Sequence, residues 1–274
     1  MTRTNSTIRL ESGKEPARNC GAVVFVVALV ASVGCFSLLP GDTLSESLVQ
    51  GAALAVVALA GMGLSCPQAL GAPRFGDAGA LGAWAAYVLV VGLAAGGTAF
   101  FLLPQGTVLD VAPLRVAQAV ALCLVTGVFE EGVFRVLALG ALVPALGGGR
   151  RGMLRAALVS AALFGALHVS LGEANFAIDA VAGMQVVLKP LQAGLFGLFM
   201  AALYFATRNL WTLVVVHAAF NLLYTGPQLL AGNLQQTYLT GNPLDLALLA
   251  ATVALLLPAA WAAIRTMRHP EVSR

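Results

Sequence analysis

Three ionisable side chains interrupt one apolar run of the sequence, between Val125 and Ala138. Glu130 and Glu131 are adjacent, and Arg135 follows four residues after Glu131. An ionisable side chain near a bilayer centre costs about 2.5–3.5 kcal/mol on insertion scales, so a cluster of three indicates a function. On a helix, Glu131 and Arg135 share a face and can pair, whereas Glu130 points about 100° away. The spacing predicts a reactive carboxylate beside a structural ion pair; a cluster that only joins helices is the alternative.

Two histidines and an asparagine lie in two other apolar runs. His168 follows Phe164 by one helical turn, and His217 precedes Asn221 by one turn on the same face. A lone histidine in a helix bundle is usually an interhelical hydrogen bonder, but with Glu130 these residues form a polar set drawn from three helices. At about 1.5 Å per residue, His217 lies roughly 10 Å deep and Glu130 roughly 20 Å deep. A true offset of that size would separate His217 from a common site.

These residue types can activate water for the hydrolysis of a peptide bond. A glutamate in a low-dielectric cavity can take a proton from water, and a histidine can shuttle that proton. A second histidine and an asparagine amide can donate to a developing oxyanion. Ser160 and Ser170 flank His168 without the strained turn that a nucleophilic serine needs. A zinc site of Glu130, His168 and His217 is chemically possible, but no HExxH spacing is present and a metal is not favoured.

The composition is typical of a membrane protein. The 274 residues are 59% hydrophobic and 10% charged, whereas about a quarter of the residues in soluble domains are charged. Apolar runs of about 20 residues, the length of a spanning helix, recur along the chain. The net charge of +3 is spread over short loops, which argues against a nucleic-acid surface. The predicted fold class is all-α, a polytopic membrane bundle of about eight transmembrane helices.

Eight spans are predicted between two cytosolic tails, residues 1–19 and 267–274. The first tail is polar and expected to be disordered. The transmembrane domain covers 20–266, and its predicted spans are 20–39, 48–66, 80–103, 114–142, 153–171, 185–207, 210–230 and 244–264. The fourth span is long and carries the charged cluster, so it is expected to be tilted or broken.

The charges between the predicted spans give an orientation in the cell membrane. Most Lys and Arg residues fall in the tails and in the loops of one side. The alternate loops are mainly acidic, with Lys189 as their basic exception. This asymmetry predicts that both termini are cytosolic.

The order of the three motifs resembles the CPBP family of intramembrane proteases, also called the type II CAAX endopeptidase or Abi family. The motifs are Glu-Glu-x-x-x-Arg at 130–135, Phe-x-x-x-His at 164–168 and His-x-x-x-Asn at 217–221, each in its own apolar helix. The aromatic-rich stretch 194–221 also looks like the penultimate signature region of this family. The resemblance places a CPBP-like core at about 114–231.

The resemblance implies an intramembrane endopeptidase that hydrolyses peptide bonds of membrane-associated substrates, including CaaX-like or prenylated ones. By the same resemblance, Glu130 activates water with help from His168, and His217 and Asn221 stabilise the oxyanion. The residues that orient the site are Glu131, Arg135 and Phe164. No cofactor is favoured, although zinc is possible. The implied partners are the lipid bilayer and a membrane-associated protein or peptide, with no nucleic acid.

Three alternatives stay open at the level of sequence. The first is a zinc-dependent form of the same protease. The second is a proton-coupled transporter, in which intramembrane Glu and His residues form a relay and a charged route leads to both faces. The third is a non-catalytic bacteriocin-immunity or scaffold membrane protein that keeps the motif residues for packing.

Overall fold

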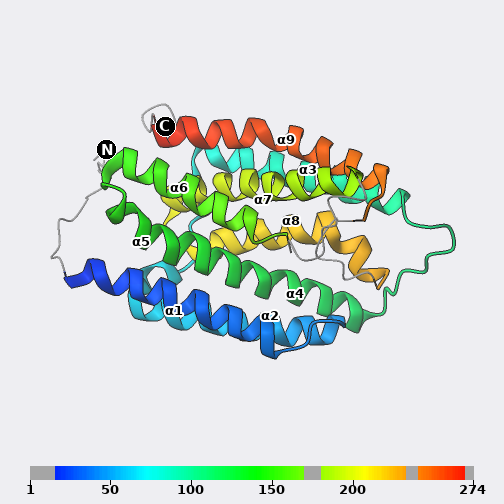
Figure 1. Ribbon diagram of the computed structural model, residues 1–274, viewed down its shortest axis with the longest axis horizontal. Coiled ribbons are helices and arrows are strands. Elements are labelled where there is room, and N and C mark those ends of the chain that lie inside the picture. Colours follow the sequence, from blue (N-terminus) through cyan, green and yellow to red (C-terminus); the bar gives the residue numbers. More distant parts are fainter. Residues whose placement is uncertain (1–15, 170–179, 233–239, 269–274) are drawn as a thin grey trace.

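A computed structural model describes residues 16–169, 180–232 and 240–268 of the chain (Figure 1). All regular secondary structure in these ranges is helical, which confirms the all-α prediction. Six of the helices are long and apolar enough to cross a membrane. The protein is therefore a multi-pass membrane protein, while the predicted count of eight spans is not confirmed.

The helices follow the predicted spans closely. In chain order they are α1 Pro16–Leu38, α2 Leu44–Ser65, α3 Ala80–Phe101, α4 Pro113–Glu131, the π-helical turn η3 Gly132–Leu137, α5 Ala138–Ala145, α6 Gly149–Ala166, α7 Ala180–Thr207, α8 Leu210–Leu230 and α9 Pro243–Arg268. Two 3-10 turns, η1 Pro67–Leu70 and η2 Phe75–Ala78, lie between α2 and α3. The first helix begins at Pro16 and the last ends at Arg268, a few residues outside the predicted bounds of the transmembrane domain at 20 and 266.

The fourth and fifth predicted spans are helical but are not among the six candidate membrane spans. Each of the two helices carries three charged residues along its length. Those of α4 are Arg115, Glu130 and Glu131, and those of α6 are Arg150, Arg151 and Arg155. Helix α9 also carries three charged residues, but these lie near its two ends and leave residues 246–264 without a charge.

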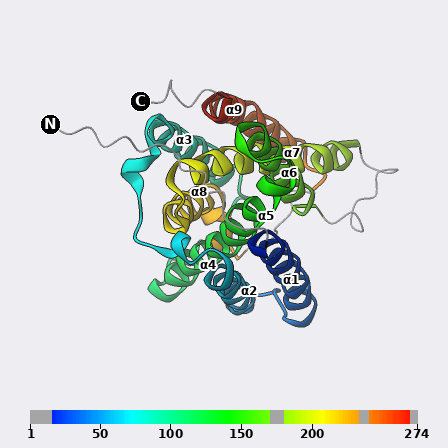
Figure 2. The ribbon, with the colours of Figure 1, turned by 90° about the vertical axis from the view of Figure 1, so that its left-hand side faces the viewer.

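The helices form one elongated bundle (Figure 1). In both views α1 and α2 lie together on one side and α9 lies on the opposite side, with α4, α5 and α8 between them (Figure 2). Helix α1 begins and α9 ends at the same end of the bundle (Figure 1). That this end faces the cytosol stays a prediction.

The fourth predicted span is interrupted by a π-helical turn, η3, which directly follows Glu131. The Ala138 N–H bonds to the carbonyl of Val133, five residues back. Gly132 lets α2 approach this turn, because a Cβ atom there would lie 2.9 Å from Cε of Met62. Single π turns within α-helices are frequent at functional sites. The fourth span is therefore irregular immediately beside the two glutamates, although its helix continues from Pro113 to Ala145 without a break.

The sequence assigned Lys189 to the basic exceptions among the loops, and this assignment is wrong. Helix α7 begins at Ala180, so Lys189 lies well inside it. Its side chain is buried, at 7% exposure. The charge asymmetry between the two sets of loops is therefore cleaner than predicted, and a buried cation needs a separate explanation.

Candidate active site

A buried charged layer joins α4, the π turn and α8. Glu131 and Arg135 are both 0% exposed, and Nε of Arg135 lies 3.2 Å from Oε2 of Glu131. The other oxygen, Oε1 of Glu131, lies 2.5 Å from Nδ1 of His217. Because an ionised carboxylate only accepts hydrogen bonds, Nδ1 of His217 carries the proton of this bond. Glu131 therefore fixes both the orientation and the tautomer of the imidazole.

Glu130 lies beside this layer but remains partly accessible. Its side chain is 18% exposed, and its Oε2 atom lies 3.2 Å from Nε2 of His217. The two adjacent glutamates thus face the two nitrogen atoms of one imidazole ring. The predicted 10 Å offset of His217 from the rest of the site is wrong, because helix ends do not share a common depth and residue counts from them do not measure height.

The guanidinium of Arg135 is held by charge and by an aromatic ring. Its central carbon lies 4.0 Å from the centroid of Phe164, a cation–π contact. None of its three nitrogen atoms has a hydrogen-bond partner in the described part of the chain, so its contact with Glu131 is an ion pair without hydrogen-bond geometry. Gly197 on α7 leaves room for this group, because a Cβ atom there would lie 2.9 Å from Nη2 of Arg135. The sequence contained no signal for the role of Gly197.

His168 follows the end of α6 and is half-buried. Its Nδ1 atom lies 2.7 Å from the carbonyl oxygen of Phe164. A carbonyl only accepts, so Nδ1 donates, and Nε2 is the atom that can exchange a proton with a ligand. The ring of Phe164 contacts the rings of both histidines, at centroid distances of 4.4 Å to His168 and 6.4 Å to His217. Phe164 is therefore the common support of Arg135 and the two histidines.

Asn221 lies one turn after His217 on α8 and is half-buried. Its backbone carbonyl accepts from Oγ1 of Thr225 at 2.8 Å. Of the sequence-predicted polar residues, Glu130, His168 and Asn221 are therefore partly accessible, while Glu131, Arg135 and His217 form the buried layer. All seven sequence-predicted residues lie on α4, the π turn, α8 or the end of α6.

The predicted zinc ligands do not form a ligand set. Nε2 of His217 faces Glu130 directly, and Nδ1 of the same ring faces Glu131. Nδ1 of His168 donates a hydrogen bond to the carbonyl of Phe164 and is therefore not available to a metal ion. Within residues 16–169, 180–232 and 240–268, no group of three His, Cys, Asp or Glu side chains is arranged to hold a metal ion. We therefore derive no step through a metal.

Ser160 supports the π turn from α6, a role that the sequence did not indicate. Its side chain is 1% exposed, and its hydroxyl donates to the carbonyl of Phe134 at 2.5 Å. In a regular α-helix that carbonyl would accept from the N–H of Ala138, which here bonds to Val133 instead. Ser160 thus satisfies a buried acceptor that the π turn leaves without its usual partner.

Replacing Ser160 by alanine is expected to destabilise the protein by about 1–3 kcal/mol, because a buried carbonyl loses its donor. The free energy of unfolding in detergent would measure this loss. Ser37→Ala is the matched control: the Ser37 hydroxyl bonds to a carbonyl in the same way but is exposed, and a change within about 0.5 kcal/mol is expected. Equal losses in the two variants would contradict the role of Ser160.

The fold and this centre define a multi-pass membrane protein that carries a glutamate–histidine site inside its helix bundle. Residues 112–223 match the Rce1-like family, described as type II CAAX prenyl endopeptidase Rce1-like, and the resemblance drawn from the motifs is confirmed. The matched range contains all three motifs, from Glu130 to Asn221. The family implies a protease, in general terms an intramembrane endopeptidase of the CAAX type. No curated protein matches the chain.

Proposed function

We propose that this protein is an intramembrane endopeptidase in which Glu130 activates water against a peptide bond of a membrane-associated substrate. CaaX-like or prenylated chains are the substrate class that the family suggests. The observation that supports the proposal most directly is the difference between the two adjacent glutamates. Glu131 is 0% exposed and paired with Arg135, whereas Glu130 is 18% exposed and faces His217 alone. Only Glu130 can meet both water and substrate.

The proposed reaction begins when the carboxylate of Glu130 takes a proton from water. The water oxygen forms a bond to the peptide carbonyl carbon, and the carbonyl electrons move to its oxygen. Nε2 of His217, when protonated, and the amide of Asn221 donate to this oxyanion. The proton then passes to the amide nitrogen through Glu130 and Nε2 of His168. The C–N bond breaks, leaving an amine and a carboxylic acid, which then loses its proton to Glu130 to become a carboxylate.

The buried layer has a positioning role in this mechanism. Glu131 holds His217 through Nδ1 and stabilises the imidazolium form, as a carboxylate does in hydrolytic triads. Arg135 balances the charge of Glu131, and Phe164 fixes the guanidinium from its open face. Preorganised groups of this kind lower the barrier because they do not have to rearrange as charge develops.

Cleavage of a library of membrane-anchored peptides by the purified protein in lipid bilayers tests the proposal. We expect discrete cleavage products by mass spectrometry, formed equally well in the presence of a metal chelator. Activity that is lost with chelator and restored by added zinc would assign the site to a metal centre instead. If no peptide is cleaved while protons or solutes cross sealed vesicles, the relay of a transporter becomes the better explanation.

A further inference from the structure

A second polar cluster lies in the interior of the bundle, between α7 and α8. Nζ of Lys189 donates to Oε1 of Gln192 at 3.0 Å, and Nε2 of Gln192 donates to the hydroxyl of Tyr224 at 2.8 Å. The ammonium also lies 5.9 Å from the centroid of the Tyr224 ring. All three side chains are buried, at 7%, 3% and 4% exposure for Lys189, Gln192 and Tyr224. None of these residues belongs to the three motifs.

The cluster is physically continuous with the proposed active site. Tyr224 stacks on Phe220 at 5.5 Å, Phe220 stacks on Phe196 at 4.6 Å, and Phe196 meets the ring of His217 edge-on at 5.0 Å. Tyr224 also lies three residues after Asn221 on α8, so the two side chains share a helix face.

We propose that Lys189, Gln192 and Tyr224 form a subsite that binds a carboxylate of the substrate near the bond to be cleaved. This inference rests on the proposed protease function and adds the part of the substrate that the enzyme recognises. The carboxylate belongs either to the end of the substrate chain or to an acidic side chain. The ammonium supplies its charge, and the phenol hydroxyl and the amide of Gln192 supply neutral donors.

The chemistry of this cluster favours an anionic ligand. A lysine in the interior of a membrane protein is costly and usually marks a path or a binding site. Ammonium-to-carboxylate hydrogen bonds are shorter and about twice as strong as neutral ones. A carboxylate bound here would not compete for Arg135, which is committed to Glu131 and Phe164.

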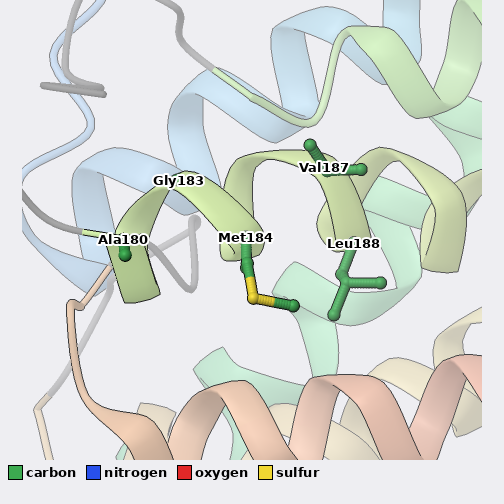
Figure 3. A pocket seen from close by; sticks show the side chains of 5 residues that line it. All are labelled: Ala180, Gly183, Met184, Val187 and Leu188. Atoms are coloured by element: carbon green, nitrogen blue, oxygen red, sulfur yellow. The ribbon is translucent and has the colours of Figure 1, made fainter. Parts of the chain in front are cut away.

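The first turns of α7, before Lys189, have an apolar face, although the buried Gln185 also lies there and donates to Thr240. The preceding turns bear a pocket of about 350 Å³, and its lining residues in the described part of the chain are Ala180, Gly183, Met184, Val187 and Leu188 (Figure 3). Met184 and Leu188 point to the same side of the helix in this view (Figure 3). These side chains can accommodate apolar parts of a substrate but offer no charge. On this part of α7, recognition of an anion therefore falls to Lys189.

The test uses two pairs of membrane-anchored peptides and four proteins. One pair differs only in a free C-terminal carboxylate against a carboxamide, and the other only in an internal Asp against Asn, with both ends amidated. The proteins are the wild type, Lys189→Met, Lys189→Arg and, as a control, Arg265→Met, which removes an exposed cation from α9. The measured quantity is the ratio of kcat/KM between the two members of a pair.

We expect the wild type to prefer the carboxylate member of one pair by about 10- to 100-fold, the strength of a charged hydrogen bond. The pair that shows the preference identifies the source of the carboxylate. Lys189→Met should bring the ratio close to one, Lys189→Arg should retain most of it, and Arg265→Met should leave it unchanged. Tyr224→Phe, which removes one hydroxyl, should lower the ratio by about 3- to 10-fold. This variant keeps the test decisive if Lys189→Met does not fold.

Two results would overturn the subsite: equal kcat/KM for both members of both pairs in the wild type, or an unchanged ratio in Lys189→Met. Binding separates this failure from a failure of the protease proposal. The same peptides are titrated into Glu130→Gln protein, and fluorescence anisotropy gives Kd. If the wild type cleaves no peptide but the carboxylate peptides bind more tightly than their neutral partners, the protease proposal fails and the subsite stands. Equal Kd values within both pairs would contradict the proposed subsite, whether or not the protein cleaves peptides.

Discussion

Glu130→Gln is expected to lower kcat for peptide hydrolysis by about 10²–10⁴-fold, the usual contribution of a general base. The amide has nearly the shape of the carboxylate but cannot take a proton from water. Glu130 is 18% exposed and lies 3.2 Å from His217 at the edge of the buried layer. A glutamine side chain therefore fits there without leaving a fully buried charge without its partner. We therefore expect normal folding and a Kd for substrate close to that of the wild type.

Single-turnover cleavage of the best peptide, measured together with thermal unfolding, checks this expectation. Asp77→Asn is the matched control, since it makes the same chemical change at an exposed residue of η2, away from the site. It should retain full activity. A folded Glu130→Gln protein that cleaves at the wild-type rate would contradict the proposed mechanism. A wild-type protein that cleaves no peptide would favour the scaffold alternative.

Arg135→Met is expected to destabilise the protein by about 3–5 kcal/mol, the typical effect of removing one partner of a buried ion pair. Both Glu131 and Arg135 are 0% exposed, so water cannot reach the carboxylate that is left. Glu131 would keep its hydrogen bond from Nδ1 of His217 at 2.5 Å but would lose the guanidinium that balances its charge. The loss arises from an uncompensated charge, and methionine keeps most of the volume that packs on Phe164.

A double-mutant cycle separates this effect from lost packing. Glu131→Gln with Arg135→Met removes both charges, and the pair should be less destabilised than the sum of the single variants by about 1–3 kcal/mol. Unfolding in detergent measures all three free energies, and Arg265→Met controls for the loss of an exposed cation. If Arg135→Met is as stable as the wild type, the ion pair is not a structural element of the site.

The helices and the motif residues were predictable from the sequence because both signals are local. A run of apolar residues of spanning length is read directly from the chain, and a charge inside such a run is conspicuous because of its cost in the bilayer. The pairing of Glu131 with Arg135 was also predictable, since residues four apart share a helix face. The same rule separated Glu130 from Glu131 before any tertiary information.

The errors came from quantities that the chain order does not contain. Depths counted from helix ends placed His217 apart from Glu130, yet the two side chains are in contact. The number of spans depends on whether α4 and α6 tolerate their charges, and length alone does not decide this. Lys189 was counted among the loop charges although it lies within the predicted span 185–207, and its burial against neighbouring helices follows only from the tertiary structure.

The sequence by itself determined the set of candidate site residues and the helices on which they lie, because apolar length, charge and helical spacing act within one segment. Only the tertiary structure decided that the two glutamates face the two nitrogens of His217, and that Glu130 is the accessible one of the two. It also brought Ser160 of α6 into hydrogen-bonding contact with the π turn. In the same way it linked Lys189 to Tyr224 through hydrogen bonds of Gln192. These contacts depend on the relative height and rotation of packed helices, which many residues set together and no single motif encodes.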